Sequence, residues 1–270
     1  MRLKFLLLEQ LNKKNQIYLY HFMLEKMKAL AIEAGEAILT FYHDEIEIDR
    51  KDDNSPLTKA DLAAHKIIVR GLQKIAPDIP IISEESEIPD FEIRKIWDRF
   101  FLVDPLDGTK EFIKKNGEFT VNIALIEKNI PVSGVVYIPA KETLYFADKE
   151  TGSWVQKGSG DASMITHTPY DKARPARIAV SRSHGGNDTK ERLSEMGIEV
   201  SEEIPYGSSL KICLVAEGKA DIYPRFGPTM EWDTAAADAV YRYSGKNGHC
   251  TSPLTYNKPI LKNDEFIIGL

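Results

Sequence analysis

Apolar residues near the start of the chain recur every three or four positions. Between residues 23 and 41 they form one stripe of Leu24, Met27, Ala31, Ala34, Ile38 and Phe41. After Asp61 a second stripe consists of Ala64, Ile68, Leu72 and Ile75. This spacing places the apolar side chains on one face of a helix. The pattern predicts helices over residues 23–41 and 61–75, joined by a polar loop over residues 44–56.

Shorter apolar runs follow, and they have the length and composition of β-strands. They predict strands over residues 80–83, 101–104, 119–127, 130–137, 143–147 and 153–156. Lys128-Asn129 has the length of a hairpin turn, and Gly152 suits a second turn. The stretch between residues 86 and 99 is polar and predicts a loop with a short helix. The first half therefore reads as helices packed on a mostly antiparallel sheet.

The pattern changes after Gly158-Ser-Gly-Asp161, which has the composition of a linker. Strands are predicted over residues 177–181, 220–223 and 266–270, and helices over residues 187–196, 209–217 and 233–243. Alternating strands and helices are typical of an α/β arrangement. Together the two halves predict an α+β protein, with an antiparallel-sheet N-terminal part and an α/β C-terminal part.

Composition narrows the possible functions. The 270 residues are 43% hydrophobic and 28% charged, and the net charge is −6. These values fit a globular protein and argue against a general nucleic-acid binder, which carries a basic face. No apolar run reaches the roughly 18 residues of a membrane span, although peripheral membrane association stays open. Cys213 and Cys250 make no disulfide framework, so a reducing compartment, the cytoplasm, is predicted. Each cysteine is readily explained as a small buried hydrophobe.

Candidate chemistry begins at Phe101-Leu102-Val103-Asp104, where an apolar strand is predicted to end at Asp104. Asp107 follows three residues later, so that both carboxylates can point into one cavity. Hard divalent cations such as Mg²⁺ prefer oxygen ligands of this kind. Gly108 allows the backbone to approach an anion closely, and Thr109 adds an amide and a hydroxyl. An ordinary Asp-Gly turn is the simpler explanation for Asp107 and Gly108 alone.

Two distant acids strengthen the metal interpretation. Glu84 follows the strand at residues 80–83, and Asp233 opens the last predicted helix. Without a cation, converging carboxylates repel one another and raise one another's pKa. Capping is a natural alternative for Asp233, which precedes Thr-Ala-Ala-Ala. Asp61, at the start of its helix, is expected close to the same cavity, and an N-cap is the favoured alternative for it.

The order and wording of these segments resemble a known family. Glu84-Glu85, Asp104-Pro-Leu-Asp-Gly-Thr109 and Trp232-Asp233 are similar to the signature of the lithium-sensitive, Mg²⁺-dependent inositol monophosphatase superfamily. The longer wording resembles its CysQ-type 3′(2′),5′-bisphosphate nucleotidases. It comprises Asp104–Phe112, Asn116–Leu125, Ser181-Arg-Ser-His184, Gly207-Ser-Ser-Leu-Lys211 and Tyr223–Thr229. The resemblance begins at about Met23, and the segment 245–250 departs from it.

This resemblance implies a layered sandwich of the sugar-phosphatase type and a site for Mg²⁺. The implied metal ligands are Glu84, Asp104, the Leu106 carbonyl, Asp107 and Asp233. Thr109, held by Asp53, would orient the attacking water, and Glu84 would help to take its proton. Contacts to the substrate are implied for Asp107, Gly108, Thr109, His184, Ser208, Lys211, Arg225 and Asp233. Structural alternatives are a solvated loop acid for Asp53, a solvated helix residue for Lys211 and a surface cation for Arg225.

The implied reaction is hydrolysis of adenosine 3′,5′-bisphosphate to AMP and phosphate by direct attack of water, in sulfur metabolism. An inositol monophosphatase or another sugar phosphatase of the superfamily is the alternative, and a non-enzymatic metal- or nucleotide-binding regulator is a third. The predicted organisation is an extension over residues 1–22, a metal-binding α+β domain over 23–158 and an α/β nucleotide-binding domain over 159–270. Residues 1–22 are either a true extension or a product of start-site choice, and a chain starting at Met23 is expected to fold. The sequence leaves the oligomeric state open.

Overall fold

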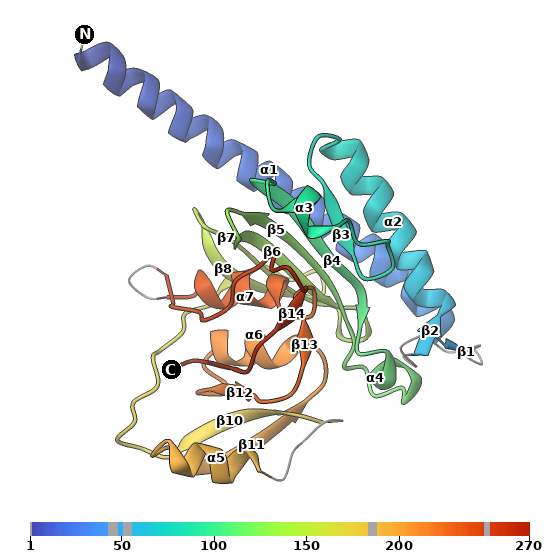
Figure 1. Ribbon diagram of the computed structural model, residues 1–270, viewed down its shortest axis with the longest axis vertical. Coiled ribbons are helices and arrows are strands. Elements are labelled where there is room, and N and C mark those ends of the chain that lie inside the picture. The colour runs from blue at the N-terminus through green and yellow to red at the C-terminus, as the bar shows by residue number, and fades with distance from the viewer. Residues whose placement is uncertain (1, 43–47, 51–55, 183–187, 246–248) are drawn as a thin grey trace.

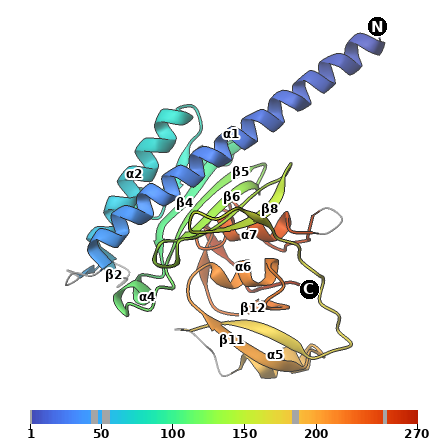
Figure 2. The same ribbon diagram turned by 180° about the vertical axis from the view of Figure 1, so that it is seen from behind.

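The computed structural model describes residues 2–42, 48–50, 56–182, 188–245 and 249–270, with the backbone alone for residues 2–17, 48–50 and 56–58. Two long helices, α1 (Arg2–Tyr42) and α2 (Lys59–Ile75), lie side by side on one face of a large sheet (Figures 1 and 2). The small hairpin β1 (Ile48–Arg50) and β2 (Pro56–Thr58) lies between them in the sequence.

Seven strands form the large sheet in sequence order: β3 (Ile81–Ser83), β4 (Arg99–Asp107), β5 (Thr120–Glu127), β6 (Ile130–Ile138), β7 (Thr143–Asp148), β8 (Gly152–Lys157) and β9 (Ser163–Met164). Only the β3–β4 pair of this sheet is parallel. Three short helices lie in its connections: α3 (Phe91–Arg94), α4 (Thr109–Ile113) and the 3₁₀ turn η1 (Pro139–Lys141).

Both faces of this sheet are apolar, because successive side chains of a strand point to opposite faces. In β5, Val121, Ile123 and Leu125 pack in the core beneath α1 and α2. Ala124 and Ile126 pack in the core on the other face, which α6 (Leu210–Ala216) and α7 (Ala235–Arg242) cover. Helix α7 lies so close to β6 that a Cβ at Gly134 would be 2.4 Å from the Ala236 carbonyl oxygen. The large sheet is therefore the middle layer between two pairs of helices.

The second half adds two outer layers (Figure 1). Its strands are β10 (Ala176–Ser181), β11 (Val200–Tyr206), β12 (Tyr223–Arg225), β13 (Thr229–Met230), β14 (Lys262–Asn263) and β15 (Phe266–Ile268). β10 and β11 pair in parallel, whereas β12–β15 and β13–β14 are antiparallel. Helix α5 (Thr189–Glu195) covers the outer side of β10 and β11. The predicted layered α+β fold is confirmed.

Several boundaries differ from the sequence prediction. β4 does not end at Asp104 but continues to Asp107, and β1 and β2 occupy part of the predicted 44–56 loop. The strand predicted over residues 220–223 begins only at Tyr223. Before it, Asp221 accepts hydrogen bonds from Arg174 and Arg177 with its side chain, and Ile222 forms a single bridge to Ile178. Helix α2 begins at Lys59, so that Asp61 lies inside its first turn rather than at its N-cap.

Helix α1 is the largest difference, because it extends back to Arg2 and projects beyond the sheet (Figure 1). No helix in the described ranges combines the length and the apolar character that a membrane crossing requires. Within the segment predicted to be an extension, Tyr20 is only 1% exposed. Its hydroxyl donates to Glu127 Oε2 at 2.6 Å and accepts from Lys149 Nζ at 2.9 Å. Tyr20 therefore ties α1 to the end of β5 and to the turn that follows β7.

We expect Tyr20→Ala to lower the free energy of unfolding by about 3 kcal/mol, because it removes a buried ring from the core. Urea unfolding measures this loss. The control is Tyr18→Ala on the same helix, where the ring is 63% exposed and the expected change is within about 0.5 kcal/mol. A chain that begins at Met23 should lose as much stability as Tyr20→Ala, whereas one that begins at Tyr18 should not. Equal stability of the two shortened chains would contradict this prediction.

Candidate active site

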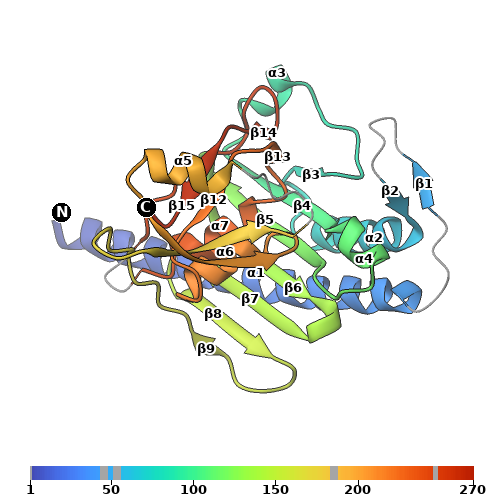
Figure 3. The same cartoon turned by 90° about the horizontal axis from the view of Figure 1, so that it is seen from below.

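The acidic residues of the first half lie on or just after the neighbouring strands β3 and β4, which are seen side by side in Figure 3. The two strands are parallel, and Ser83 pairs with Val103. The next residue, Glu84, donates its amide to the Val103 carbonyl at 3.1 Å, which brings Glu84 beside Asp104. The Ser83 hydroxyl is hydrogen-bonded to His65 Nδ1 of α2 at 2.9 Å. The strand ends thus fix both carboxylates at one edge of the sheet.

A bulge in β4 brings Asp107 to the same edge. Asp104 pairs with Asn122 of β5 and Asp107 pairs with Thr120, so Pro105 and Leu106 lie opposite Val121 alone, and β4 has one extra residue. The Leu106 amide donates to Asp104 Oδ1 at 3.1 Å within this bulge. Bulges re-aim side chains in this way without ending the strand. The bulge explains why the sequence interpretation ended the strand too early.

Gly108 makes the turn from β4 into α4. Its φ of +87° lies in the left-handed region, which glycine adopts most easily. A Cβ there would also lie 3.2 Å from both the Glu118 carbonyl oxygen and Ser208 Cβ. Thr109 follows as the first residue of α4, with its hydroxyl 3.5 Å from the Leu106 carbonyl oxygen. Gly108 therefore lets the β4–α4 turn approach the loop before α6.

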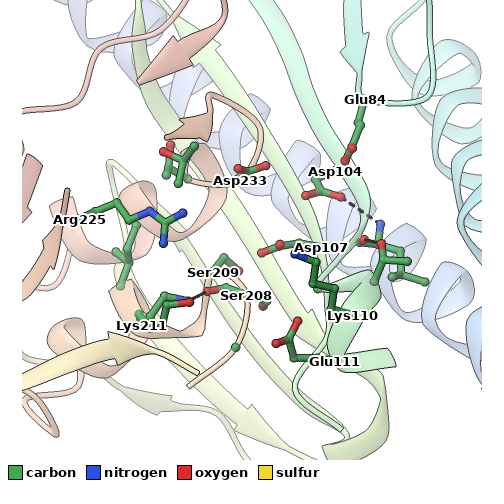
Figure 4. A pocket seen from close by; sticks show the side chains of 18 of the residues that line it. Glu84, Asp104, Asp107, Lys110, Glu111, Ser208, Ser209, Lys211, Arg225 and Asp233 are labelled. Carbon is green, nitrogen blue, oxygen red and sulfur yellow. Dashed lines mark hydrogen bonds between the residues drawn. The ribbon is translucent and has the colours of Figure 1, made fainter. Parts of the chain in front are cut away.

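The second half completes the cavity with Asp233, Lys211 and Arg225. Asp233 lies just before α7 and accepts the Met230 amide at 2.8 Å. Lys211, in the first turn of α6, is buried and donates to the Ser208 carbonyl and, at 3.4 Å, to the Tyr206 carbonyl. Arg225 donates to the Pro228 carbonyl at 2.8 Å. Figure 4 shows these two cations on the side of the cavity opposite Glu84 and Asp104.

Ten of the twelve predicted site residues line this single cavity of about 390 Å³. They are Glu84, Asp104, Leu106, Asp107, Gly108, Thr109, Ser208, Lys211, Arg225 and Asp233. The other two, Asp53 and His184, lie outside the described residues, so their roles stay predictions. The cavity joins acids from the first half with cations from the second.

Burial shifts the charges in this cavity. Burial and the nearby charges of Glu84, Asp107 and Asp233 raise the pKa of Asp104 well above its usual value. Burial also raises the pKa of Asp107 to about 6, although Lys211 opposes the shift. The pKa of Asp233 is raised by burial and then by Asp107. Burial lowers the pKa of Lys211 to about 8. The negative charges of these carboxylates are therefore not balanced by the positive charges near them.

The donor set fits a hard divalent cation. The carboxylates of Glu84, Asp104, Asp107 and Asp233 and the carbonyl of Leu106 are all oxygen donors, the kind that Mg²⁺ prefers. Within the described ranges, no three acidic, histidine or cysteine side chains converge tightly enough to hold an ion as they stand. A cation bound among these carboxylates would offset their mutual repulsion. These residues are therefore suited to hold a cation.

Some residues of the site were missed by the sequence interpretation. Asp61, treated mainly as a cap, is buried and close enough to Asp104 to raise its pKa. Thr120 and Asn122 of β5 belong to the family-like segment Asn116–Leu125, but no role in the site was predicted for them from the sequence. Thr120 Oγ1 lies 2.8 Å from Ser208 Oγ and 3.1 Å from Ser209 Oγ, and Ser209 donates to Asn122 Oδ1 at 2.8 Å. A polar residue among the apolar positions of a strand was the available signal.

The raised pKa of Asp107 predicts a pH-dependent instability of the metal-free protein. A carboxyl whose pKa is raised on folding contributes stability that is present below its unfolded pKa, about 4, and is lost as the pH rises through its folded pKa. Asp107→Asn removes that charge. The stability advantage of Asp107→Asn over the wild type should therefore grow as the pH rises from 4 through about 6.

Urea unfolding of both proteins in EDTA measures this advantage. The lowered pKa values of His65 and His167 make the protein more stable as the pH rises, which is the opposite trend. Both proteins contain these histidines, so their contribution cancels in the difference between the two free energies of unfolding. Mg²⁺ at pH 7 should narrow the difference, because a cation that binds only the folded state stabilises the wild type more. A pH-independent difference would show that Asp107 carries no strained charge.

Comparisons with known proteins agree with this geometry. The family model of the inositol monophosphatase family matches residues 20–255. The 3′(2′),5′-bisphosphate nucleotidase CysQ of Salmonella typhimurium is 48% identical over 229 residues, which cover 84% of this chain and 90% of that protein.

Solved structures show the same fold. CysQ from Bacteroides thetaiotaomicron, described as a bacterial member of the inositol monophosphatase family, has a TM-score of 0.72 at 44% identity. The match covers 90% of this chain and 95% of that one. The extragenic suppressor protein suhB from Bartonella henselae has a TM-score of 0.68 at 26% identity, over 83% of this chain and 85% of its own. By its cavity, its fold and these matches, the chain belongs to the inositol monophosphatase family.

Proposed function

We propose that this protein is a Mg²⁺-dependent 3′(2′),5′-bisphosphate nucleotidase that hydrolyses adenosine 3′,5′-bisphosphate to AMP and phosphate. The observation that carries the proposal is one cavity with a buried acidic cluster on one side and two cations, Lys211 and Arg225, on the other. Carboxylates that hold metal ions suit the phosphate that is cleaved. The positively charged side chains of Lys211 and Arg225 suit a second phosphate on the same molecule. Relatives that are 48% identical and named 3′(2′),5′-bisphosphate nucleotidase support this substrate.

The acidic cluster would hold the cations through Glu84, Asp104, the Leu106 carbonyl, Asp107 and Asp233. When bound, Mg²⁺ supplies a Lewis acid for the phosphate and its attacking water. The protein contributes the fixed positions of the ligands. β3 and β4 hold Glu84 and Asp104 in register, and the Met230 amide holds one oxygen of Asp233.

The attacking water needs a group that orients it and takes its proton. Thr109 lines the cavity and presents a hydroxyl, and Glu84 lies beside Asp104. Asp53 stays the predicted partner of Thr109. Asp61 is a second candidate for that role, because it is buried near Asp104. Comparing Asp53→Asn with Asp61→Asn would separate the two, since only the true partner should lower turnover without weakening binding of the substrate.

The remaining contacts would select the nucleotide. Arg225 can pair with the 5′-phosphate through two parallel hydrogen bonds. Ser208 and the predicted His184 would contact the same part of the substrate, and Gly108 and Thr109 would face the phosphate that is cleaved. On this proposal residues 23–158 form the metal-binding half and residues 159–270 the nucleotide-binding half, although Asp233 crosses that division. Both cysteines are free thiols, which supports a reducing compartment such as the cytoplasm.

A phosphate-release panel tests the proposal. Adenosine 3′,5′-bisphosphate, inositol 1-phosphate and fructose 1,6-bisphosphate are compared at saturating Mg²⁺. The nucleotide should have the highest kcat/KM. Ca²⁺ should support turnover poorly because it is larger and coordinates more loosely, and Li⁺ should inhibit more than Na⁺ or K⁺. Preference for inositol 1-phosphate would replace the nucleotidase assignment by that of another phosphatase of the family.

A further inference from the structure

An ion pair between buried Glu118 and the more exposed Arg182 lies just behind the cavity and joins the two halves of the chain. Glu118, before β5, is 6% exposed and accepts two hydrogen bonds from Arg182, which follows β10. Arg182 Nε lies 2.7 Å from Glu118 Oε2, and Arg182 Nη2 lies 2.8 Å from Oε1. Parallel bonds of this kind fix geometry as well as charge. Neither residue has yet been given a role in the site.

Both members of the pair also hold the loop that leads into α6. Glu118 Oε2 accepts the Gly207 amide at 2.9 Å. Arg182 Nη2 donates to the Pro205 carbonyl at 2.9 Å, and the Arg182 amide donates to the Tyr206 carbonyl at 3.2 Å. Three consecutive residues, Pro205 and Tyr206 at the end of β11 and Gly207 in the loop, are therefore attached to the Glu118–Arg182 pair.

The conformation of this loop requires such support. A Cβ at Gly207 would lie 2.7 Å from Glu111 Cγ and 2.9 Å from the Glu118 carbonyl oxygen, so the loop is pressed against the first half. Ser208 has a φ of +50°, a left-handed conformation that is unfavourable for a residue with a side chain. Strain of this kind persists only where the surroundings over-determine the backbone. Thr120 supports the loop from its other flank.

The loop carries groups that define the cavity. Gly207, Ser208 and Ser209 line it. The Ser208 carbonyl accepts from Lys211 Nζ, and the Ser209 amide donates to Asp107. A shift of the loop would move Ser208 and Lys211 relative to Glu84 and Asp104, which the pairing of β3 with β4 keeps in place.

We propose that the Glu118–Arg182 pair is a positioning device for nucleotide recognition, which sets the 205–209 loop so that Ser208 and Lys211 face the acidic cluster. The inference rests on the proposed function. The Glu118–Arg182 pair would position the groups that bind the nucleotide part of the substrate, away from the phosphate that is cleaved. Misplacing binding groups by about 1 Å can cost up to a hundredfold in rate. A small monophosphate, which reaches only the acidic cluster, should be less affected.

The test compares wild type, Arg182→Lys and Glu118→Gln, each with Mg²⁺. Arg182→Lys keeps the charge but loses the parallel bonds. Both variants should lower kcat/KM for adenosine 3′,5′-bisphosphate by about tenfold or more, chiefly through KM, and change that for a small monophosphate by less than about threefold. Calorimetric titration with AMP, the product, should show the same loss of affinity. The matched control is Arg192→Lys, because Arg192 forms a similar two-bond pair with Glu265 away from the cavity.

The outcomes separate this inference from the proposed function. If wild type does not hydrolyse the bisphosphate, the proposed function fails. If wild type does, but Arg182→Lys leaves the ratio of the two specificity constants unchanged, the positioning role is overturned. An equal fall for both substrates with a lower Tm would make the pair a structural contact only. Should Glu118→Gln not fold, Arg182→Lys and the AMP titration still decide.

Discussion

Replacing Asp104 by Asn should lower kcat by about three orders of magnitude, equivalent to about 4 kcal/mol of transition-state stabilisation. Asp104 lies at the centre of the acidic cluster, where Glu84, Asp107, Asp233 and Asp61 all raise its pKa. An asparagine has nearly the same shape and can still accept the Leu106 amide. It lacks the negative charge that a cation needs. The loss should therefore be one of cation binding and turnover rather than of the fold.

Two measurements distinguish this result from simple damage. Without metal, Asp104→Asn should be at least as stable as wild type to urea, because it removes one charge from a repelling cluster. Calorimetric titration with Mg²⁺ should show weaker binding. Asp98→Asn, which removes an exposed acid outside the cavity, should leave kcat unchanged. Near wild-type turnover of Asp104→Asn at saturating Mg²⁺ would remove Asp104 from the metal site.

Much of the site could be predicted because several of its residues follow recognisable apolar runs. Glu84 and Asp104 each come directly after an apolar run, and parallel pairing of those runs brings the two carboxylates together. Asp233 was placed by its position before an alanine-rich helix. Local patterns indicate where such residues lie along the chain. The resemblance to the family's motifs indicated which of them act together in one site.

The remaining features depend on contacts that no local pattern encodes. The β4 bulge arises from pairing with β5, so the sequence alone ended the strand at Asp104. Lys211 was predicted to contact the substrate, yet its ammonium group also binds two backbone carbonyls, which only the fold of the 205–209 loop brings near. The burial of Tyr20 follows from packing on strands more than a hundred residues later.

The second large effect is expected from Arg225, which should govern the choice of substrate. The acidic cluster and Thr109 explain hydrolysis of a phosphate monoester but not its identity. Arg225 lines the cavity on the side opposite Glu84 and Asp104, where a second phosphate would lie. Its Nη2 donates to the Pro228 carbonyl and its buried Nε has no hydrogen-bond partner among the described residues, so part of the guanidinium remains able to pair with an anion. Inositol 1-phosphate has no second phosphate to use it.

Arg225→Ala should therefore lower kcat/KM for adenosine 3′,5′-bisphosphate by about tenfold or more, roughly 1.4 kcal/mol or above, and change that for inositol 1-phosphate much less. Arg225→Lys is the matched variant, because it keeps the charge but not the two parallel hydrogen bonds, and it should fall between the two. Lys211→Met should behave differently. Lys211→Met removes the charge that offsets Asp107, whereas a displaced 205–209 loop keeps that charge, so both substrates should suffer. If Arg225→Ala leaves the ratio of the two specificity constants unchanged, Arg225 does not contact the second phosphate, and selectivity must come from another part of the cavity.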